Sequence, residues 1–130
     1  INTKLYRSQY TEDLDAAIKH NDRDASQGSY VIRVRDRIKA DEEWKNYSAN
    51  DLKEKEISGI TLTEREILEQ AVFLATGQHL DVLWTLCSGS RYRDDRVPSC
   101  GWRRGEFRVG WDDPDSAASD LRCREVVSAN

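Results

Sequence analysis

Several residue types are scarce in this chain, and each shortage argues against a class of structure or function. Its 130 residues include no methionine, two prolines, two histidines and three cysteines. No apolar run approaches the ~20 residues that a membrane-spanning helix needs, so we expect no membrane span. Nothing in the sequence ties His20 or His79 to a serine or cysteine nucleophile. We therefore predict a protein without enzymatic activity and without a cofactor.

The cysteines do not form a metal-binding pattern. Cys87, Cys100 and Cys123 are odd in number and contain no CxxC pair. Structural zinc needs four ligands at characteristic spacings, and only His79 is near in sequence, so no metal is predicted. The sequence is compatible with one disulfide and one free thiol, and it favours three reduced, buried thiols.

Length and composition indicate one folded domain over residues 1–130. Apolar residues make up 38% and charged residues 34%, but four Trp, five Tyr and regular aliphatic spacing argue against disorder. We expect residues 1–81 to form a mainly helical scaffold with one strand. Residues 82–130 are expected to form a sheet with ligand-binding loops.

Lysine is missing from the second part of the chain. Residues 1–81 carry 16 acidic and 12 basic groups, six of them Lys, whereas residues 82–130 carry 8 and 8, and all eight basic groups are Arg. Arg suits contact surfaces because its planar group makes paired hydrogen bonds and stacks on aromatic rings. A GC-rich genome also favours Arg codons, but that cause does not explain why residues 1–81 keep six Lys. Because the charges balance, we predict no nucleic-acid binding.

The N-terminal part shows three elements. Thr11 is placed to cap a helix that runs through His20, and residues 21–29 are typical of a loop. Residues 30–35 alternate apolar and basic side chains, which predicts a half-buried strand. Ser48 begins a second capped helix that ends before Gly59.

The clearest predicted element is a helix over 64–76. Thr63 is expected to be its N-cap, with Glu66 completing a capping box and Leu62 and Ile67 forming a hydrophobic staple. Gly77 is expected to adopt the left-handed conformation that ends a helix. His79 is interpreted as a loop or cap residue. The face expected to enter the core consists of Ile67, Leu68, Ala71, Val72, Leu74 and Ala75.

After Asp81 the apolar period changes to two, which predicts strands at 82–87, 106–111 and 121–127. Long loops, 88–105 and 112–120, lie between them, and such loops commonly carry function. The predicted fold class is α+β, with helices packed on a small antiparallel sheet.

Acidic residues gather in one loop. Asp112, Asp113 and Asp115 lie beside Pro114, and clustered carboxylates suit calcium. Their spacing does not match an EF-hand, and Asp and Pro are ordinary turn residues. We interpret the segment as a turn.

The C-terminal residues follow an order that resembles the C-type lectin fold. A strand is expected at residues 84–87, followed by a Pro-bearing loop at Val97-Pro98-Ser99, then by Trp111-Asp112-Asp113, and then by a last strand expected to carry Cys123 and Glu125. The resemblance implies a lectin-like fold. The lectin's calcium tripeptide, acidic residue–Pro–Asn, is here Val97-Pro98-Ser99, which argues against calcium-dependent sugar binding.

Within that fold the chain resembles the variable proteins of diversity-generating retroelements. Those elements rewrite adenines, so Asn codons scatter into a set that includes Arg, Ser, Asp, Gly, Tyr and Ala, but not Lys, Gln, Met, Trp or Glu. Residues 88–120 contain no Lys, Gln, Met, Leu, Ile, Asn or Thr. Trp102, Glu106 and Trp111 resemble fixed framework. The resemblance implies a variable, loop-borne surface that binds a protein or other macromolecular ligand.

We expect the contact residues to lie mostly exposed on one contiguous face, above a buried Trp84, Trp111 and Leu121. Tyr92, Arg93 and Arg104 are the expected hot spots. The alternative function is a small regulatory or protein-interaction module of a phage or mobile element that uses the charged helices. The predicted contact residues are Arg91, Tyr92, Arg93, Asp94, Ser99, Arg103, Arg104, Arg108, Asp112, Asp113, Ser116, Ser119 and Asp120.

Overall fold

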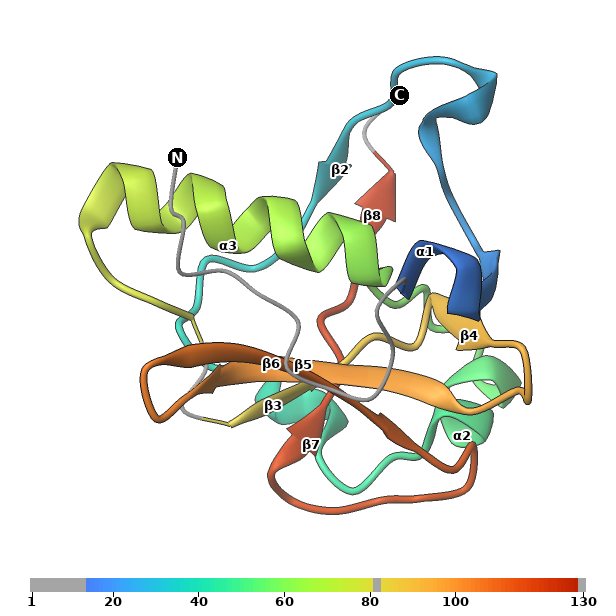
Figure 1. The fold of residues 1–130 in the computed structure, drawn as a ribbon. Coiled ribbons are helices and arrows are strands. Elements are labelled where there is room, and N and C mark those ends of the chain that lie inside the picture. Colours follow the sequence, from blue (N-terminus) through green and yellow to red (C-terminus); the bar gives the residue numbers. More distant parts are fainter. Residues whose placement is uncertain (1–13, 81–82, 129–130) are drawn as a thin grey trace.

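The computed structural model describes residues 14–80 and 83–128, and its fold is α+β (Figure 1). A four-stranded sheet in the order β6-β5-β3-β7 lies at its centre. Helix α3 crosses one face of this sheet, and α2 lies on the opposite side (Figure 1). The sheet consists of β3 (Trp84–Leu86), β5 (Val97–Arg103), β6 (Glu106–Asp112) and β7 (Leu121–Arg122).

The pairing of the central sheet departs from the predicted antiparallel arrangement in one place. Strands β5 and β6 form an antiparallel hairpin in which Val97 pairs with Asp112 and Arg103 with Glu106. Strands β3 and β5 are also antiparallel. Strands β3 and β7 are parallel, because the long segment 112–120 carries the chain back before β7 begins.

Two smaller sheets join distant parts of the chain. Strand β1 (Ile18–Asn21) pairs with β4 (Ser90–Tyr92), and β2 (Ile32–Arg33) pairs with β8 (Val127–Ser128). Helix α1 (Leu14–Ala17) therefore ends before the predicted boundary at His20. Local spacing favours a helix there, but the backbone groups of 18–21 bond to β4 instead. Thr11, its predicted cap, lies outside the described residues.

The remaining N-terminal elements are short. The predicted strand 30–35 is confirmed only at Ile32–Arg33. Two 3₁₀-helices flank it, η1 (Ala25–Gln27) and η2 (Glu42–Trp44). Helix α2 (Ala49–Glu54) follows Ser48, whose hydroxyl accepts a hydrogen bond from the Asp51 amide in a full capping box, so its predicted start is confirmed.

Helix α3 (Leu62–Thr76) begins two residues before its predicted start. Thr61, not Thr63, is the N-cap: its hydroxyl accepts a hydrogen bond from the Glu64 amide at 3.1 Å, and the Glu64 carboxylate accepts one from the Thr61 amide at 2.9 Å. The predicted staple of Leu62 and Ile67 is therefore wrong. Gly77 ends the helix at φ 74°, as predicted.

Contacts to Glu64 explain why the earlier cap is used. Arg23 donates two hydrogen bonds to its carboxylate at 2.8 Å, and Tyr30 donates a third. Burial alone would raise the pKa of Glu64, but Arg23, the Thr61 amide and Tyr30 together lower it. The N-terminal loop is thereby joined to α3.

The cap assignment predicts unequal effects for two threonines. Thr61→Ala is expected to lower the free energy of unfolding by about 0.5–2 kcal/mol, because it removes the hydroxyl that accepts from the Glu64 amide. Thr63→Ala is the matched control at an exposed helical position and is expected to change little. Urea unfolding of both variants measures the difference. A larger loss for Thr63→Ala would contradict the assignment.

The buried face of α3 differs from the predicted one. Ile67 and Leu74 are 61% and 64% exposed, whereas Arg65 and Glu69 are fully buried. Arg65 pairs with Glu69 at 3.1 Å and donates to the Thr85 hydroxyl at 3.3 Å. This polar contact with the sheet rotates the helix away from the orientation that its aliphatic pattern predicts.

Two apolar clusters lie on opposite sides of the central sheet. On the α3 side, Leu62, Phe107 and Val109 pack with Cys87 and Cys100. On the α2 side the cluster comprises Ala49, Leu52, Leu86, Val97, Leu121 and Cys123. Residues of β5 and β6 alternate between these sides, which fixes the direction of every side chain on the two strands.

Buried polar groups connect α3 to its surroundings. The Nδ1 atom of His79 lies 2.7 Å from Glu69 Oε2, and its ring is stacked between Phe73 and Trp102. The buried Arg124 donates to the Thr85 hydroxyl that Arg65 also contacts, and to the Arg37 and Ile38 carbonyls. His79 is therefore part of a structural network rather than a simple loop residue.

The three cysteines are free and buried. The sulfur atoms of Cys87 and Cys100 lie 3.5 Å apart on neighbouring strands. Burial raises the pKa of Cys123 to about 12 and that of Cys87 well above its ordinary value. Both thiols are therefore protonated at neutral pH.

Candidate binding face of the sheet

The candidate site lies on the face of the hairpin turned away from α3. The register places Ser99 opposite Gly110, Gly101 opposite Arg108, and Arg103 opposite Glu106. These residues alternate with Cys100, Phe107 and Val109, which point into the α3-side core. The hairpin thus separates a polar outer row from an apolar inner row.

A groove of about 420 Å³ runs along this face. Trp84 of β3 lines this groove, and Ala118 and Asp120 come from the segment after β6. Trp111 borders it at the end of β6, where alternation directs its ring to the side of Phe107 and Val109. We call this groove, with Arg103 and Arg108 beside it, the sheet groove. Its lining residues are Trp84, Ser99, Gly110, Trp111, Asp112, Ala118, Asp120 and Leu121.

Arginines are stacked on both tryptophans. The Arg103 guanidinium lies 4.8 Å from the Trp84 ring centroid, and that of Arg96 lies 3.8 Å from the Trp111 centroid. Arg108 is paired with Glu106 at 2.8 Å. These contacts orient the arginine side chains before any ligand binds, which reduces the entropy lost on binding.

The arginines also retain donor capacity. The Nε atoms of Arg103 and Arg108 are buried and have no hydrogen-bond partner among the described residues. A buried donor without an acceptor is costly, and a ligand acceptor would remove that cost.

The other end of the groove is acidic. Burial raises the pKa of Asp112; the Ser99 hydroxyl opposes this shift, whereas Asp113 and Asp120 add to it. The site therefore has Arg103 and the Arg108–Glu106 pair toward the β5–β6 turn, and the Asp112, Asp113 and Asp120 carboxylates, with Arg96 on Trp111, toward the end of β6. Such a distribution favours a ligand with the opposite polarity and fixes its orientation.

Five of the predicted contact residues belong to this site: Ser99, Arg103, Arg108, Asp112 and Asp120. Arg104 is exposed at the adjacent β5–β6 turn with φ 49°. Ser99 is only 4% exposed, so its predicted exposure is wrong. Its position beneath the groove follows from the packing of β5 between β3 and β6.

The four predicted residues around β4 lie elsewhere. Tyr92 is 6% exposed and its hydroxyl donates to the Gly110 carbonyl, so the predicted exposed hot spot is wrong. Arg93 is exposed and donates to the Ala16 carbonyl, and Asp94 accepts from the Arg96 amide. Arg91 lines a separate cavity. Pairing of β4 with β1, which local spacing does not reveal, determines these positions.

The last three predicted residues lie in the segment between β6 and β7. Asp113 and Ser119 are exposed, and Ser116 donates through its amide to the Asp113 carbonyl. Neighbouring carbonyls in this segment accept from the amides of Asn46 and Asn50. The segment is therefore held against the start of α2 and borders the groove through Ala118 and Asp120.

Sequence reasoning assigned the tryptophans to the wrong place. Trp111 is 41% exposed and Trp84 is half-buried, whereas both were expected beneath the surface; Leu121 is buried, as predicted. Trp111 sits near the end of β6, and the Arg96 guanidinium stacks on its ring.

Comparisons with known proteins add no family to this geometry. No family model, curated protein or solved structure matches the chain. Across residues 14–80 and 83–128, no helix has the length and apolar character to cross a membrane. Within those same ranges, no group of three or more His, Cys, Asp or Glu side chains is arranged to hold a metal ion.

Proposed function

We propose that this protein is a binding protein of the C-type lectin kind, whose sheet groove displays variable residues to a macromolecular ligand. The observation that carries the proposal is that residues selected from the sequence lie together on one face of the sheet. Ser99, Asp112 and Asp120 were selected from sequence alone and line one groove, and the selected Arg103 and Arg108 lie on the same face of the hairpin. Trp and Arg supply much of the binding energy in protein interfaces.

The position of these residues suits variation. The backbone groups of Ser99, Arg103, Arg108 and Asp112 belong to the paired strands β5 and β6, whose hydrogen bonds do not depend on side-chain identity. The apolar inner row of Cys100, Phe107 and Val109 is unaffected when the outer row changes. Arg, Ser and Asp all belong to the set that adenine rewriting produces, whereas Trp84 and Trp111 do not. The tryptophans therefore act as fixed anchors among changing neighbours.

The alternative is an interaction module that uses the helices, and one observation favours it. Ile67 and Leu74 lie exposed on the outer side of α3 together with Ala71. Exposed apolar side chains that follow one face of a helix are characteristic of protein contacts. The experiments below therefore compare the sheet groove with this face.

We expect the outer row to tolerate substitution. Replacing Arg103, Arg108 and Asp112 together by serine is expected to change the free energy of unfolding by about 1 kcal/mol or less, because the stacking and ion pairing of these side chains are partly exposed to solvent. Urea unfolding measures this. The matched control replaces Phe107 with serine in the inner row, which should unfold the domain. A collapse of the outer-row variant would contradict the proposal.

The binding function is tested by two displayed libraries. One library varies positions 99, 103, 108, 112 and 120 within the adenine-permitted residue set, and the control library varies the exposed positions 63, 67, 71, 74 and 75 on α3. Selection against hen lysozyme as the probe is expected to enrich binders from the first library, and Trp111→Ala is expected to weaken them about tenfold or more. Enrichment from the α3 library alone would favour the alternative.

The retroelement origin has its own test. The genome that encodes this chain is expected to hold a nearby reverse transcriptase gene and a near-identical repeat of the region coding for residues 88–120, differing only at adenines. A genome without that repeat would overturn the variable-protein part of the proposal and leave the binding groove to be judged by the libraries.

A further inference from the structure

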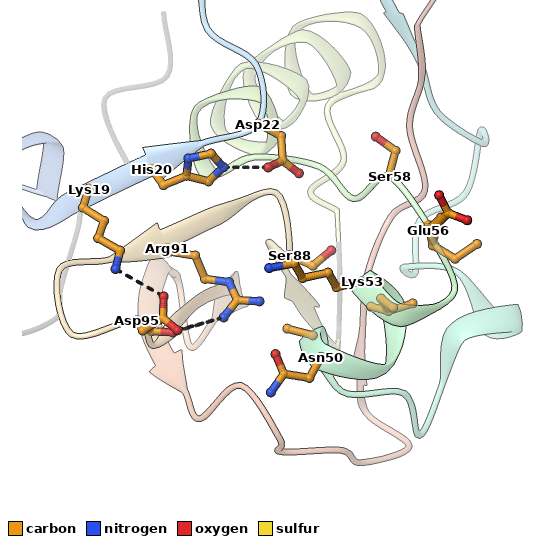
Figure 2. A pocket seen from close by; sticks show the side chains of 13 residues that line it. Lys19, His20, Asp22, Asn50, Lys53, Glu56, Ser58, Ser88, Arg91 and Asp95 are labelled. Carbon is orange, nitrogen blue, oxygen red and sulfur yellow. Dashed lines mark hydrogen bonds and ion pairs between the residues drawn. The ribbon is translucent and has the colours of Figure 1, made fainter.

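A second cavity lies apart from the sheet groove. It has a volume of about 610 Å³ and is enclosed by β1, α2, β4 and the segment that follows α2 (Figure 2). It shares no lining residue with the sheet groove. Its size is within the range typical of small-molecule sites. We call it the α2–β4 cavity, and its charged lining residues include Lys19, Lys53, Glu56, Arg91 and Asp95.

Arg91 is the central group of this cavity. Its side chain is only 12% exposed, and its guanidinium points into the cavity from β4 (Figure 2). The Nη1 atom contacts Asp95, at 3.3 Å from the carbonyl oxygen and 3.7 Å from Oδ2. Neither Nε nor Nη2 has a hydrogen-bond partner among the described residues. A mostly buried guanidinium with donors directed at open space is suited to a ligand acceptor.

The other charges leave a cationic side to the cavity. Asp95 is shared by two cations, since Lys19 lies 3.3 Å from it and Arg91 is its second partner. Lys53 of α2 supplies another cation that has no ion pair within the described ranges. The Glu56 carboxylate lies at the rim, well away from Arg91 (Figure 2). Arg91 and Lys53, from different walls, are therefore available to the same anion.

At the opposite rim of the cavity, His20 and Asp22 are paired with each other. His20 Nε2 lies 2.8 Å from Asp22 Oδ1, so this carboxylate already has a partner and does not face Arg91 (Figure 2). Ile57, half-buried, adds an apolar surface beside these polar groups. The cavity thus offers a fixed cationic contact and a smaller apolar one.

We infer that the α2–β4 cavity binds a small organic anion, with Arg91 as its main contact and Lys53 as its second. A carboxylate or a phosphate monoester presents the two oxygens that the free edge of the guanidinium recognises. The organic part of the ligand lies against Ile57. This site is independent of the sheet groove, so either can fail without the other.

The test uses the full chain and three probes: benzoate, phenyl phosphate and neutral benzamide. Calorimetry is expected to detect binding of an anion and none of benzamide, with amide NMR shifts confined to the residues that line the cavity. Arg91→Gln is expected to weaken anion binding about tenfold, and Lys53→Gln several-fold. Comparing benzoate with phenyl phosphate distinguishes a carboxylate site from a phosphate site.

Matched variants separate the site from general charge. Lys55→Gln changes a lysine on the same helix end outside the cavity, and Arg93→Gln changes the neighbouring arginine; both are expected to bind the anion as the parent does. Trp111→Ala tests independence from the sheet groove and should also leave anion binding unchanged. Thermal unfolding verifies that each variant is folded. Equal binding of benzamide, no binding of either anion at millimolar concentration, or equal losses in the Lys53 and Lys55 variants would overturn the inference.

Discussion

Glu69→Leu is expected to lower the free energy of unfolding by about 3–5 kcal/mol. Glu69 is fully buried and contacts three groups: Arg65 at 3.1 Å, His79 Nδ1 at 2.7 Å and the Leu80 amide at 3.3 Å. Leucine leaves the Arg65 charge in the interior without this carboxylate. Because small domains have about 5–15 kcal/mol of stability in total, the substitution removes much of it.

A compensated variant separates charge from packing. Arg65→Met combined with Glu69→Leu removes both buried charges, and we expect it to recover much of the stability that Glu69→Leu alone removes. Arg65 also donates to Thr85, so the recovery is incomplete. Urea unfolding of the parent, both single variants and the double variant forms a double-mutant cycle. Additive losses would show that the ion pair does not hold α3 to the sheet.

Gly89→Ala is expected to cost about 1–3 kcal/mol or more, because the chain passes too close for a methyl group. An added Cβ would lie 2.4 Å from the Gly59 carbonyl oxygen and 3.1 Å from that of Ile60. Both obstacles are backbone atoms, so no rotamer change relieves the clash. The Gly89 amide also donates to the Ile60 carbonyl at 3.0 Å.

The matched control for Gly89→Ala is Gly77→Ala. Gly77 has φ 74°, and nothing lies within 4 Å of a Cβ added there, so its cost is the conformational penalty of about 1 kcal/mol. Urea unfolding compares the two. We also expect Gly89→Ala to speed hydrogen exchange at the Asp22 amide, which donates to the Gly89 carbonyl. A smaller loss of stability for Gly89→Ala than for Gly77→Ala would show that the backbone at Gly59 and Ile60 moves readily to admit the methyl group.

Local signals in the sequence were sufficient where they were unambiguous. The α2 cap at Ser48, the end of α3 at Gly77 and the β6 alternation were predicted because each depends on neighbouring residues alone. Thr61 and Thr63 both precede a glutamate by three positions, so the sequence contains two overlapping capping boxes. Arg23 and Tyr30 select the first by binding Glu64, and that contact spans a distance that local rules cannot evaluate.

Long-range pairing accounts for the remaining differences. No residue close to Ile18 in the sequence indicates that Ile18 pairs with Tyr92. The first predicted helix was therefore extended to His20, over residues that form β1. The same pairing removes Tyr92 from the surface and places Arg91 in the α2–β4 cavity. The buried Arg65–Glu69 pair has the same origin, because charged residues are ordinarily assigned to the exposed side of a helix. The β6 part of the candidate face follows the predicted alternation, whereas β5 lies in the segment 88–105 that was predicted to be a loop.

The pairing of Ile32 with Ser128 and of Trp84 with Leu121 has a consequence for how the chain reaches its fold. Strands β7 and β8 follow β2 and β3 in the chain, yet they pair with β2 and with the edge of β3 that β5 does not cover. A chain still emerging from the ribosome therefore exposes an unpaired edge of β3, and such edges promote association between chains. We expect folding to be slower than in helical domains of this size, because the loops must close before these contacts form. Chaperone dependence during synthesis would follow from topology rather than from low stability.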